Sequence, residues 1–125
     1  MSPRTFEVKE TISVVGDGVA SSYTRDYMGS KTLPPNAIVQ VAEAEVAEAP
    51  DGDAMSFALE VHGGPPLDFN TDPGVAQGTQ AVAPWSTYTG PGAPWLVVRL
   101  LKAGGSVPSA PTVGAISVRV RGVIL

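Results

Sequence analysis

The chain has 125 residues, of which 8 are lysine or arginine and 12 are aspartate or glutamate, so its formal net charge is −4. This mild acidity argues against a nucleic-acid-binding protein, in which a clustered basic surface is expected. Cysteine is absent, which excludes disulfides, thiolate metal centres and cysteine nucleophiles. With 14 glycines, 12 prolines and few charges, the composition favours a single domain of strands and turns over residues 1–125.

The beginning of the chain, MSPRTFEVKE, lacks the apolar stretch of a secretory signal peptide. No segment reaches the roughly 18 consecutive apolar residues that a membrane helix requires. We therefore expect synthesis in the cytoplasm and no membrane partner.

The first predicted strand covers residues 5–15, in which apolar side chains alternate with polar ones. Glu10 interrupts the apolar face, which suggests a position near a sheet edge. The glycines of Gly16-Asp17-Gly18 favour a tight turn, and residues 19–28 are expected to return as the second strand. Prolines then stiffen a loop around residues 29–36.

Residues 37–49 contain alanine and glutamate, which favour a helix, but their valines alternate as in a strand. The following Asp51-Gly52 is typical of a two-residue hairpin turn. We therefore predict a hairpin between residues 37–49 and 56–61. Its register pairs Val46 with Phe57, Ala44 with Leu59 and Ala42 with Val61, all on one face.

Residues 63–94 are rich in glycine and proline, and we expect a short strand near Gln80 to Ala83 within them. Two strands are predicted to close the chain, at residues 95–103 and 116–125. The first of these is almost continuously apolar, so both of its faces are expected to be covered. The total of six to eight short strands predicts an antiparallel β-sandwich or jelly-roll-like fold.

The segment DFNTDPG places Asp68, Asn70 and Asp72 at alternate positions, as in the beginning of a calcium-binding loop. An EF-hand loop also requires glycine at its sixth position and glutamate at its twelfth, where this chain has Pro73 and Thr79. We favour a set of turns in which these side chains bind nearby backbone N–H groups. No metal or other cofactor is therefore assigned, although calcium remains an alternative for these three residues.

No catalytic site can be assembled from the sequence. His62 is the only histidine, and it is expected at a strand end on the surface. No nucleophile elbow, phosphate-binding loop or nucleophile–base pair is recognisable. We therefore predict that the protein is not an enzyme.

The aromatic residues Trp85, Tyr88 and Trp95 gather around the glycine- and proline-rich GPGAP. If exposed, they would suit a carbohydrate-binding or adhesion module, which would use Trp85 and Tyr88 and, with calcium, the DFNTDPG segment. We favour a structural role, in which Trp95 enters the core while Trp85 and Tyr88 pack a loop or an interface.

The chain resembles small virion proteins of tailed bacteriophages, in particular capsid decoration (cement) proteins and related β-sandwich head proteins. The resemblance lies in the strand rhythm of ETISVVGDGVASSYTRD, LPPNAIVQV, MSFALEVHG and PWLVVRLLKAGGSVPSAPTVGAISVRVRG. It implies a non-enzymatic protein on the capsid surface of the virion, with the major capsid protein and further copies of itself, as a trimer, for partners. The irregular residues 63–94 and the N-terminal segment are the expected contact regions.

Overall fold

The structure is a computed structural model that describes residues 4–63, 66–67, 73–102 and 104–125. Within these residues the chain forms nine strands and no helix, which confirms the predicted all-β class. The seven longer strands are β1 (Arg4–Ser13), β3 (Thr24–Thr32), β4 (Ala37–Glu48), β5 (Ser56–Val61), β7 (Gln80–Tyr88), β8 (Trp95–Leu101) and β9 (Ala115–Ile124). The remaining two, β2 (Val19–Ala20) and β6 (Pro66–Leu67), have two residues each.

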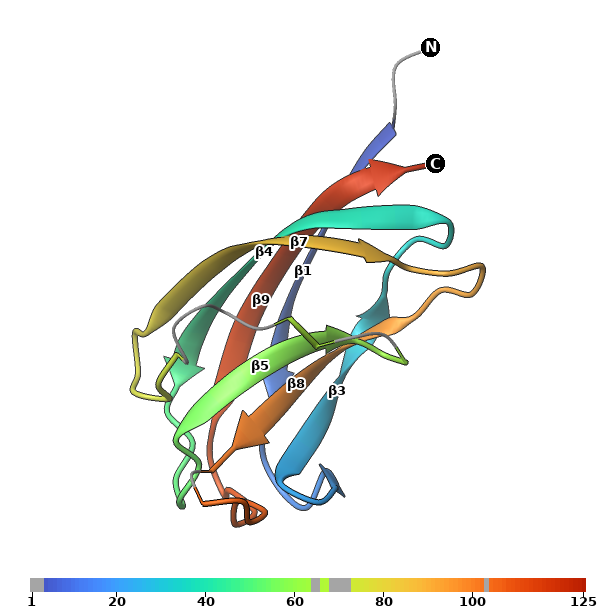
Figure 1. The fold of residues 1–125 in the computed structure, drawn as a ribbon. Coiled ribbons are helices and arrows are strands. Elements are labelled where there is room, and N and C mark those ends of the chain that lie inside the picture. Colours follow the sequence, from blue (N-terminus) through green and yellow to red (C-terminus); the bar gives the residue numbers. More distant parts are fainter. Residues whose placement is uncertain (1–3, 64–65, 68–72, 103) are drawn as a thin grey trace.

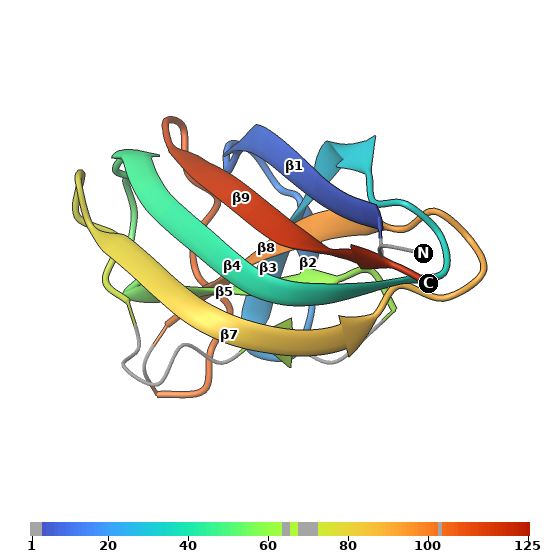
Figure 2. The same ribbon diagram turned by 90° about the horizontal axis from the view of Figure 1, so that it is seen from above.

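The strands form two antiparallel sheets that face each other. The first sheet has the order β1-β9-β4-β7, and the second has the order β2-β3-β8-β5-β6 (Figure 1). Seen from above, the first sheet lies over the second (Figure 2). The predicted β-sandwich is therefore confirmed.

The long strands alternate between the two sheets along the chain. β1 lies in the first sheet, β3 in the second, β4 in the first and β5 in the second, and β7, β8 and β9 continue the alternation. Each connection between consecutive long strands therefore passes from one sheet to the other. Consecutive strands in the chain pair within a sheet only at the short elements, as β2 with β3 and β5 with β6.

The predicted hairpin between residues 37–49 and 56–61 is wrong, although both segments are strands. β4 pairs with β7 and β9, whereas β5 pairs with β6 and β8. Val46 and Phe57 do belong to one core, but they enter it from opposite sheets. Alternation fixes which side chains point inward, and it gives no sign of whether the facing residue belongs to the same sheet.

Residues 19–28, which are predicted to return beside the first strand, lie in the second sheet instead. β1 pairs with β9, and the residues after Gly18 form β2 and β3 of the second sheet. Gly16 and Gly18 both have positive φ, at 84° and 52°, so the predicted turn chemistry is present. It directs the chain across the sandwich instead of back along the same sheet.

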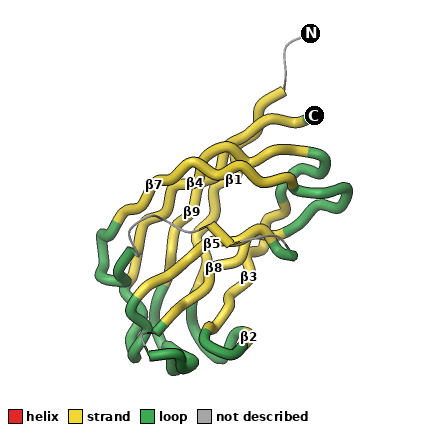
Figure 3. The backbone as a smooth tube through the Cα atoms, in the orientation of Figure 1, coloured by secondary structure: helices red, strands yellow, loops and turns green. Residues whose placement is uncertain are grey.

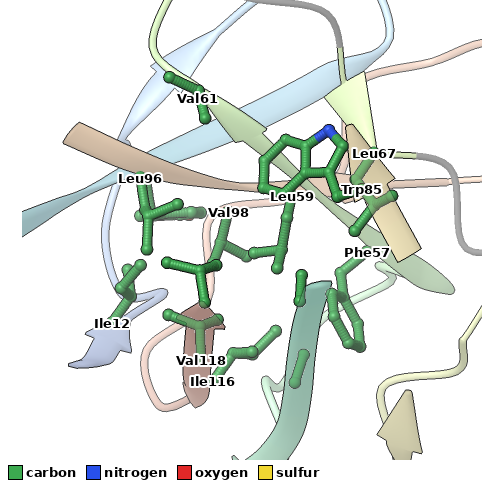
Figure 4. Packing of buried hydrophobic residues seen from close by; sticks show 14 of the residues in the cluster. Ile12, Phe57, Leu59, Val61, Leu67, Trp85, Leu96, Val98, Ile116 and Val118 are labelled. Atoms are coloured by element: carbon green, nitrogen blue, oxygen red, sulfur yellow. The ribbon is translucent and has the colours of Figure 1, made fainter. Parts of the chain in front are cut away.

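The core lies between the sheets and is made of side chains that alternate along each strand. Figure 4 shows this packing, with Trp85 beside Leu59 and Leu67. The labelled side chains come from both sheets: Ile12, Phe57, Leu59, Val61, Leu67, Trp85, Leu96, Val98, Ile116 and Val118. Burial of such side chains stabilises the fold by about 1.5–3 kcal/mol each before the loss of chain entropy is counted.

Glu10 joins the edges of the two sheets. β1 is an edge strand of the first sheet, as the interrupted apolar pattern predicted. The Glu10 carboxylate accepts hydrogen bonds from the backbone N–H of Ser30, from its hydroxyl at 2.8 Å and from the N–H of Lys31 at 3.3 Å. A Cβ at Gly29 would collide with this carboxylate, so the glycine leaves room for the contact.

Candidate docking face

The outer surface of the second sheet is built around its central strand, β8. In the strand register, Val97 lies between Met28 of β3 and Glu60 of β5, and Arg99 lies beside Asp26. Val19 of β2 is the strand partner of Asp26 on the other side. We call this surface the β8 face, and it consists of Val19, Asp26, Met28, Glu60, His62, Trp95, Val97 and Arg99.

Three charged side chains form a cluster on the β8 face. Arg99 donates from Nε to Asp26 Oδ1 at 3.1 Å and from Nη2 to Glu60 Oε2 at 2.8 Å. The two carboxylate side chains are only 19% and 12% exposed, respectively. Among the described residues, Arg99 is the one cation that pairs with either of them. The cluster therefore has one more negative than positive charge.

The electrostatic state of Glu60 reflects this environment. Burial raises the pKa of its carboxyl group above the ordinary value, and Arg99 acts in the opposite direction. Asp26 adds to the increase because its negative charge disfavours a second one nearby. His62 nearby acts in the same direction as Arg99, so further positive charge close to Glu60 would favour its charged form.

Apolar side chains surround the charged cluster. Val19 and Met28 are exposed although they are apolar, and Val97 is buried although it points away from the core. Together with Asp26, Glu60, His62 and Gly63, these three residues line a pocket of about 170 Å³. The β8 face thus combines an apolar rim with two acidic groups that lie partly below the surface.

His62 and Trp95 lie at one end of the β8 face. His62 is exposed and directly follows β5, which confirms the predicted strand-end position. Its ring meets the Trp95 ring edge to face, with centroids 6.1 Å apart and an interplanar angle of 70°. The backbone N–H of His62 also donates to the Trp95 carbonyl at 2.9 Å.

The expected positions of the two tryptophans are wrong. Trp85 is 6% exposed and belongs to the core, whereas Trp95 is 40% exposed. In β8 the inward residues are Leu96 and Val98, so Trp95 points outward. Tyr88 is exposed, as a loop or interface residue would be, and its hydroxyl donates to Asn36 Oδ1 at 2.7 Å.

Burial of Trp85 weakens the carbohydrate-binding interpretation, which required this ring on the surface. The other two residues of this aromatic group, Tyr88 and Trp95, are exposed but lie on different sheets. The calcium candidates Asp68, Asn70 and Asp72 lie outside the described residues. Elsewhere in the described chain, no group of three histidine or acidic side chains is placed to hold a metal ion.

Asp51 and Asp53 bind the loop between β8 and β9. Asp51 accepts hydrogen bonds from the N–H and hydroxyl of Thr112, and Asp53 accepts one from the Ser109 N–H at 2.7 Å. An ion pair with Lys102, at 2.7 Å, and the Ser109 bonds lower the pKa of Asp53 to about 2. These loops gather at one end of the sandwich (Figure 3).

The outer surface of the first sheet carries charges of both signs. Glu43 accepts from Arg121 at 3.1 Å and pairs with Arg119, while Lys9 pairs with Glu7 at 3.4 Å. The Arg119 Nε atom is buried and finds no hydrogen-bond partner among the described residues. Charged groups dominate this surface, and it does not combine an apolar rim with shielded carboxylates as the β8 face does, so it is the weaker candidate for docking a protein.

The described part of the glycine- and proline-rich residues 63–94 contains a longer strand than expected. The short strand predicted near Gln80 to Ala83 exists and extends to Tyr88 as β7. Pro84 lies within it, which an edge strand tolerates because one side needs no hydrogen-bond partners. The idea that this segment and the N-terminal segment contact a partner stays a prediction.

Sequence reasoning did not identify the β8 face. Arg99 is separated by 73 residues from Asp26 and by 39 from Glu60, and they meet only because β8 lies between β3 and β5. One signal was present in the sequence: Arg99 interrupts the apolar run WLVVRLL. A charge in a central strand requires a partner on a neighbouring strand.

Comparison with known proteins gives a likeness of fold. The sequence matches no family model, and no curated protein matches it either. A chain of the cyanophage Pam1 capsid asymmetric unit shares its fold with a TM-score of 0.58 and 12% sequence identity. The alignment covers 98% of the present chain and 86% of that chain.

No helix in the described residues is long and apolar enough to span a membrane.

Proposed function

We propose that this protein is a non-enzymatic structural component of a tailed-bacteriophage virion, which binds the outside of the assembled head as a decoration protein. The observation that carries the proposal is the shared fold with a chain of the cyanophage Pam1 capsid asymmetric unit. That likeness extends over 98% of the present chain, so it involves both sheets rather than one common motif.

The strand order supports the same proposal. Without β2, the sheets are β1-β9-β4-β7 and β3-β8-β5-β6, and the long strands alternate between them along the chain. We take this order as a jelly roll, an architecture that occurs in viral capsid domains and in lectins. The buried position of Trp85 favours the first of these two classes.

The proposed partners are the major capsid protein and further copies of this chain. Decoration requires a rigid scaffold with a surface that matches the shell, and it requires no catalytic group. The sandwich and its hydrogen-bonded loops supply the rigidity.

The proposed oligomer is a trimer. Size-exclusion chromatography with light scattering tests this state. A strict monomer at high protein concentration would contradict it.

Cosedimentation with purified heads of the phage that encodes the protein tests capsid binding. We expect saturable sedimentation with assembled heads and a higher temperature of head disruption in the presence of the protein. Unassembled capsid subunits serve as a control for binding that does not depend on the shell. Protein that stays in the supernatant at all head concentrations would contradict the proposal.

A further inference from the structure

The β8 face is an apolar sheet surface with a negative centre. Val19, Met28 and Trp95 are exposed there, and large apolar side chains at the surface of a sheet are typical of protein interfaces. The β8 face is also continuous, since its residues come from neighbouring strands in one sheet. Its apolar part is therefore a surface, and not a set of isolated side chains.

The charges of the β8 face indicate what charge a complementary partner would carry. Asp26 and Glu60 share the single guanidinium of Arg99, and both are mostly shielded from water. A carboxylate in such surroundings is stabilised by a second cation, because ionic attraction is stronger where water is excluded. The complementary partner group is therefore positively charged.

The size and lining of the pocket indicate which kind of cation would fit it. The volume of about 170 Å³ is several times the share of one water molecule in the liquid, which is about 30 Å³. Val19, Met28 and Val97 offer apolar walls, and the polar residues Asp26, Glu60 and His62 also line the pocket. Lysine and arginine have an apolar stem and a charged end, which match these two parts of the pocket.

We propose that the β8 face is the surface that docks on the phage head, and that its pocket receives a lysine or arginine side chain of the capsid shell. The proposal rests on the proposed function, since the partner is the shell protein. The apolar rim would cover neighbouring apolar residues of the shell, while the inserted cation would pair with Glu60 and Asp26. A small hydrated metal ion would leave the apolar walls unused.

A lysine supplied by the chain itself tests the proposal. Val19 is 66% exposed and is the strand partner of Asp26, so Val19→Lys places an ammonium group next to the pocket without disturbing the core. We expect this variant to bind heads at least tenfold more weakly than the wild type in cosedimentation. Val82→Lys is the matched control, because Val82 is 67% exposed on the first sheet, and we expect its binding to stay within twofold.

The possible outcomes separate the docking surface from the function. If the wild-type protein does not bind heads, the proposed function fails. If it binds heads and Val19→Lys binds equally well, the docking surface is wrong while the function stands. If Val19→Lys alters the mass of the oligomer and leaves head binding unchanged, a second copy of this chain covers the β8 face, which also overturns the proposal.

A second measurement examines the pocket without capsids. Titration of the labelled wild-type protein with n-butylammonium, followed by nuclear magnetic resonance, should shift the amide signals of Met28, Glu60 and Val97. Butanol should produce smaller shifts, and Glu60→Gln should reduce the response to the ammonium ion. Equal shifts with both compounds would show an apolar pocket without preference for a cation, which would contradict the inserted lysine or arginine.

Discussion

At the scale of single residues, burial depends on whether a strand position points towards the core or away from it. Ala83, Trp85 and Thr87 alternate inward along β7, and Leu96 begins the inward series of β8. Trp85 therefore packs in the core, and its neighbours Pro84 and Ser86 face water. The segment AVAPWSTY does not reveal this pattern, because the exposed Val82 is apolar and the buried Thr87 is polar. The continuous run WLVVRLL likewise does not show which way Trp95 points.

Replacement of the two tryptophans should have unequal effects on stability. We expect Trp85→Ala to lower the free energy of unfolding by about 3–5 kcal/mol, since it leaves a cavity between the sheets. Trp95→Ala, the matched control, should cost about 1 kcal/mol or less, because its ring is largely outside the core. Urea denaturation measures both changes, and equal losses would contradict the assigned positions.

Asp53 contributes to the loss of folding stability at low pH. Folding lowers its pKa from an ordinary 3.8 to about 2, so the folded state binds fewer protons than the unfolded state between these values. The stabilisation is complete above about pH 4 and is lost as the pH falls towards 2. Asp53→Asn should therefore flatten the loss of stability over this interval. Thermal melting at several pH values checks this, and an unchanged slope would contradict it.

At the scale of elements, the edge strand β1 is held to the second sheet by polar contacts, most of them made by the Glu10 carboxylate. Glu10 accepts hydrogen bonds from Ser30 and Lys31 near the end of β3. The sandwich is thus closed on this side by polar contacts, while apolar packing dominates its interior.

Removal of this carboxylate should loosen the edge locally. We expect Glu10→Ala to lower the free energy of unfolding by about 1–2 kcal/mol, since several hydrogen bonds to a charged group are lost. Hydrogen exchange at the amides of Ser30 and Lys31 should accelerate in the same variant. Glu7→Ala is the control on the same strand: its exposed ion pair with Lys9 is expected to contribute about 0–1 kcal/mol. Unchanged exchange in Glu10→Ala would refute the role of the carboxylate.

The existence and inward faces of most strands could be predicted from the sequence, because alternation is a local property. Ile116, Val118 and Val120 are buried as their pattern indicated, with Arg119 and Arg121 outside. The pairing of strands could not be predicted, since it depends on which sheet each connection reaches. The Asp51-Gly52 turn shows the difficulty: Gly52 has a φ of 91°, as turn chemistry demands, yet β4 and β5 lie in different sheets.

The candidate site was less predictable than the fold. The β8 face depends on strand order, which brings Asp26 and Glu60 to either side of Arg99. No local pattern connects residues so far apart in the chain. Val97 points outward and is nevertheless buried. Its burial depends on its strand neighbours Met28 and Glu60, so it could not be predicted from the sequence.

At the scale of the whole molecule, the two outer surfaces differ in chemistry. The first sheet presents two arginines that share the carboxylate of Glu43, and the second presents the apolar and acidic β8 face. If the protein decorates the head as we propose, the second sheet would lie on the shell and the first would face solvent. We therefore expect a single orientation on the head.

Cryo-electron microscopy of heads with and without the protein tests binding and orientation together. The difference map should contain additional density on the outer shell that fits the two-sheet sandwich. In that density the second sheet should face the shell, with a lysine or arginine of the capsid protein at Glu60. A difference map without additional density, at saturating protein, would contradict the proposal that this chain decorates the phage head.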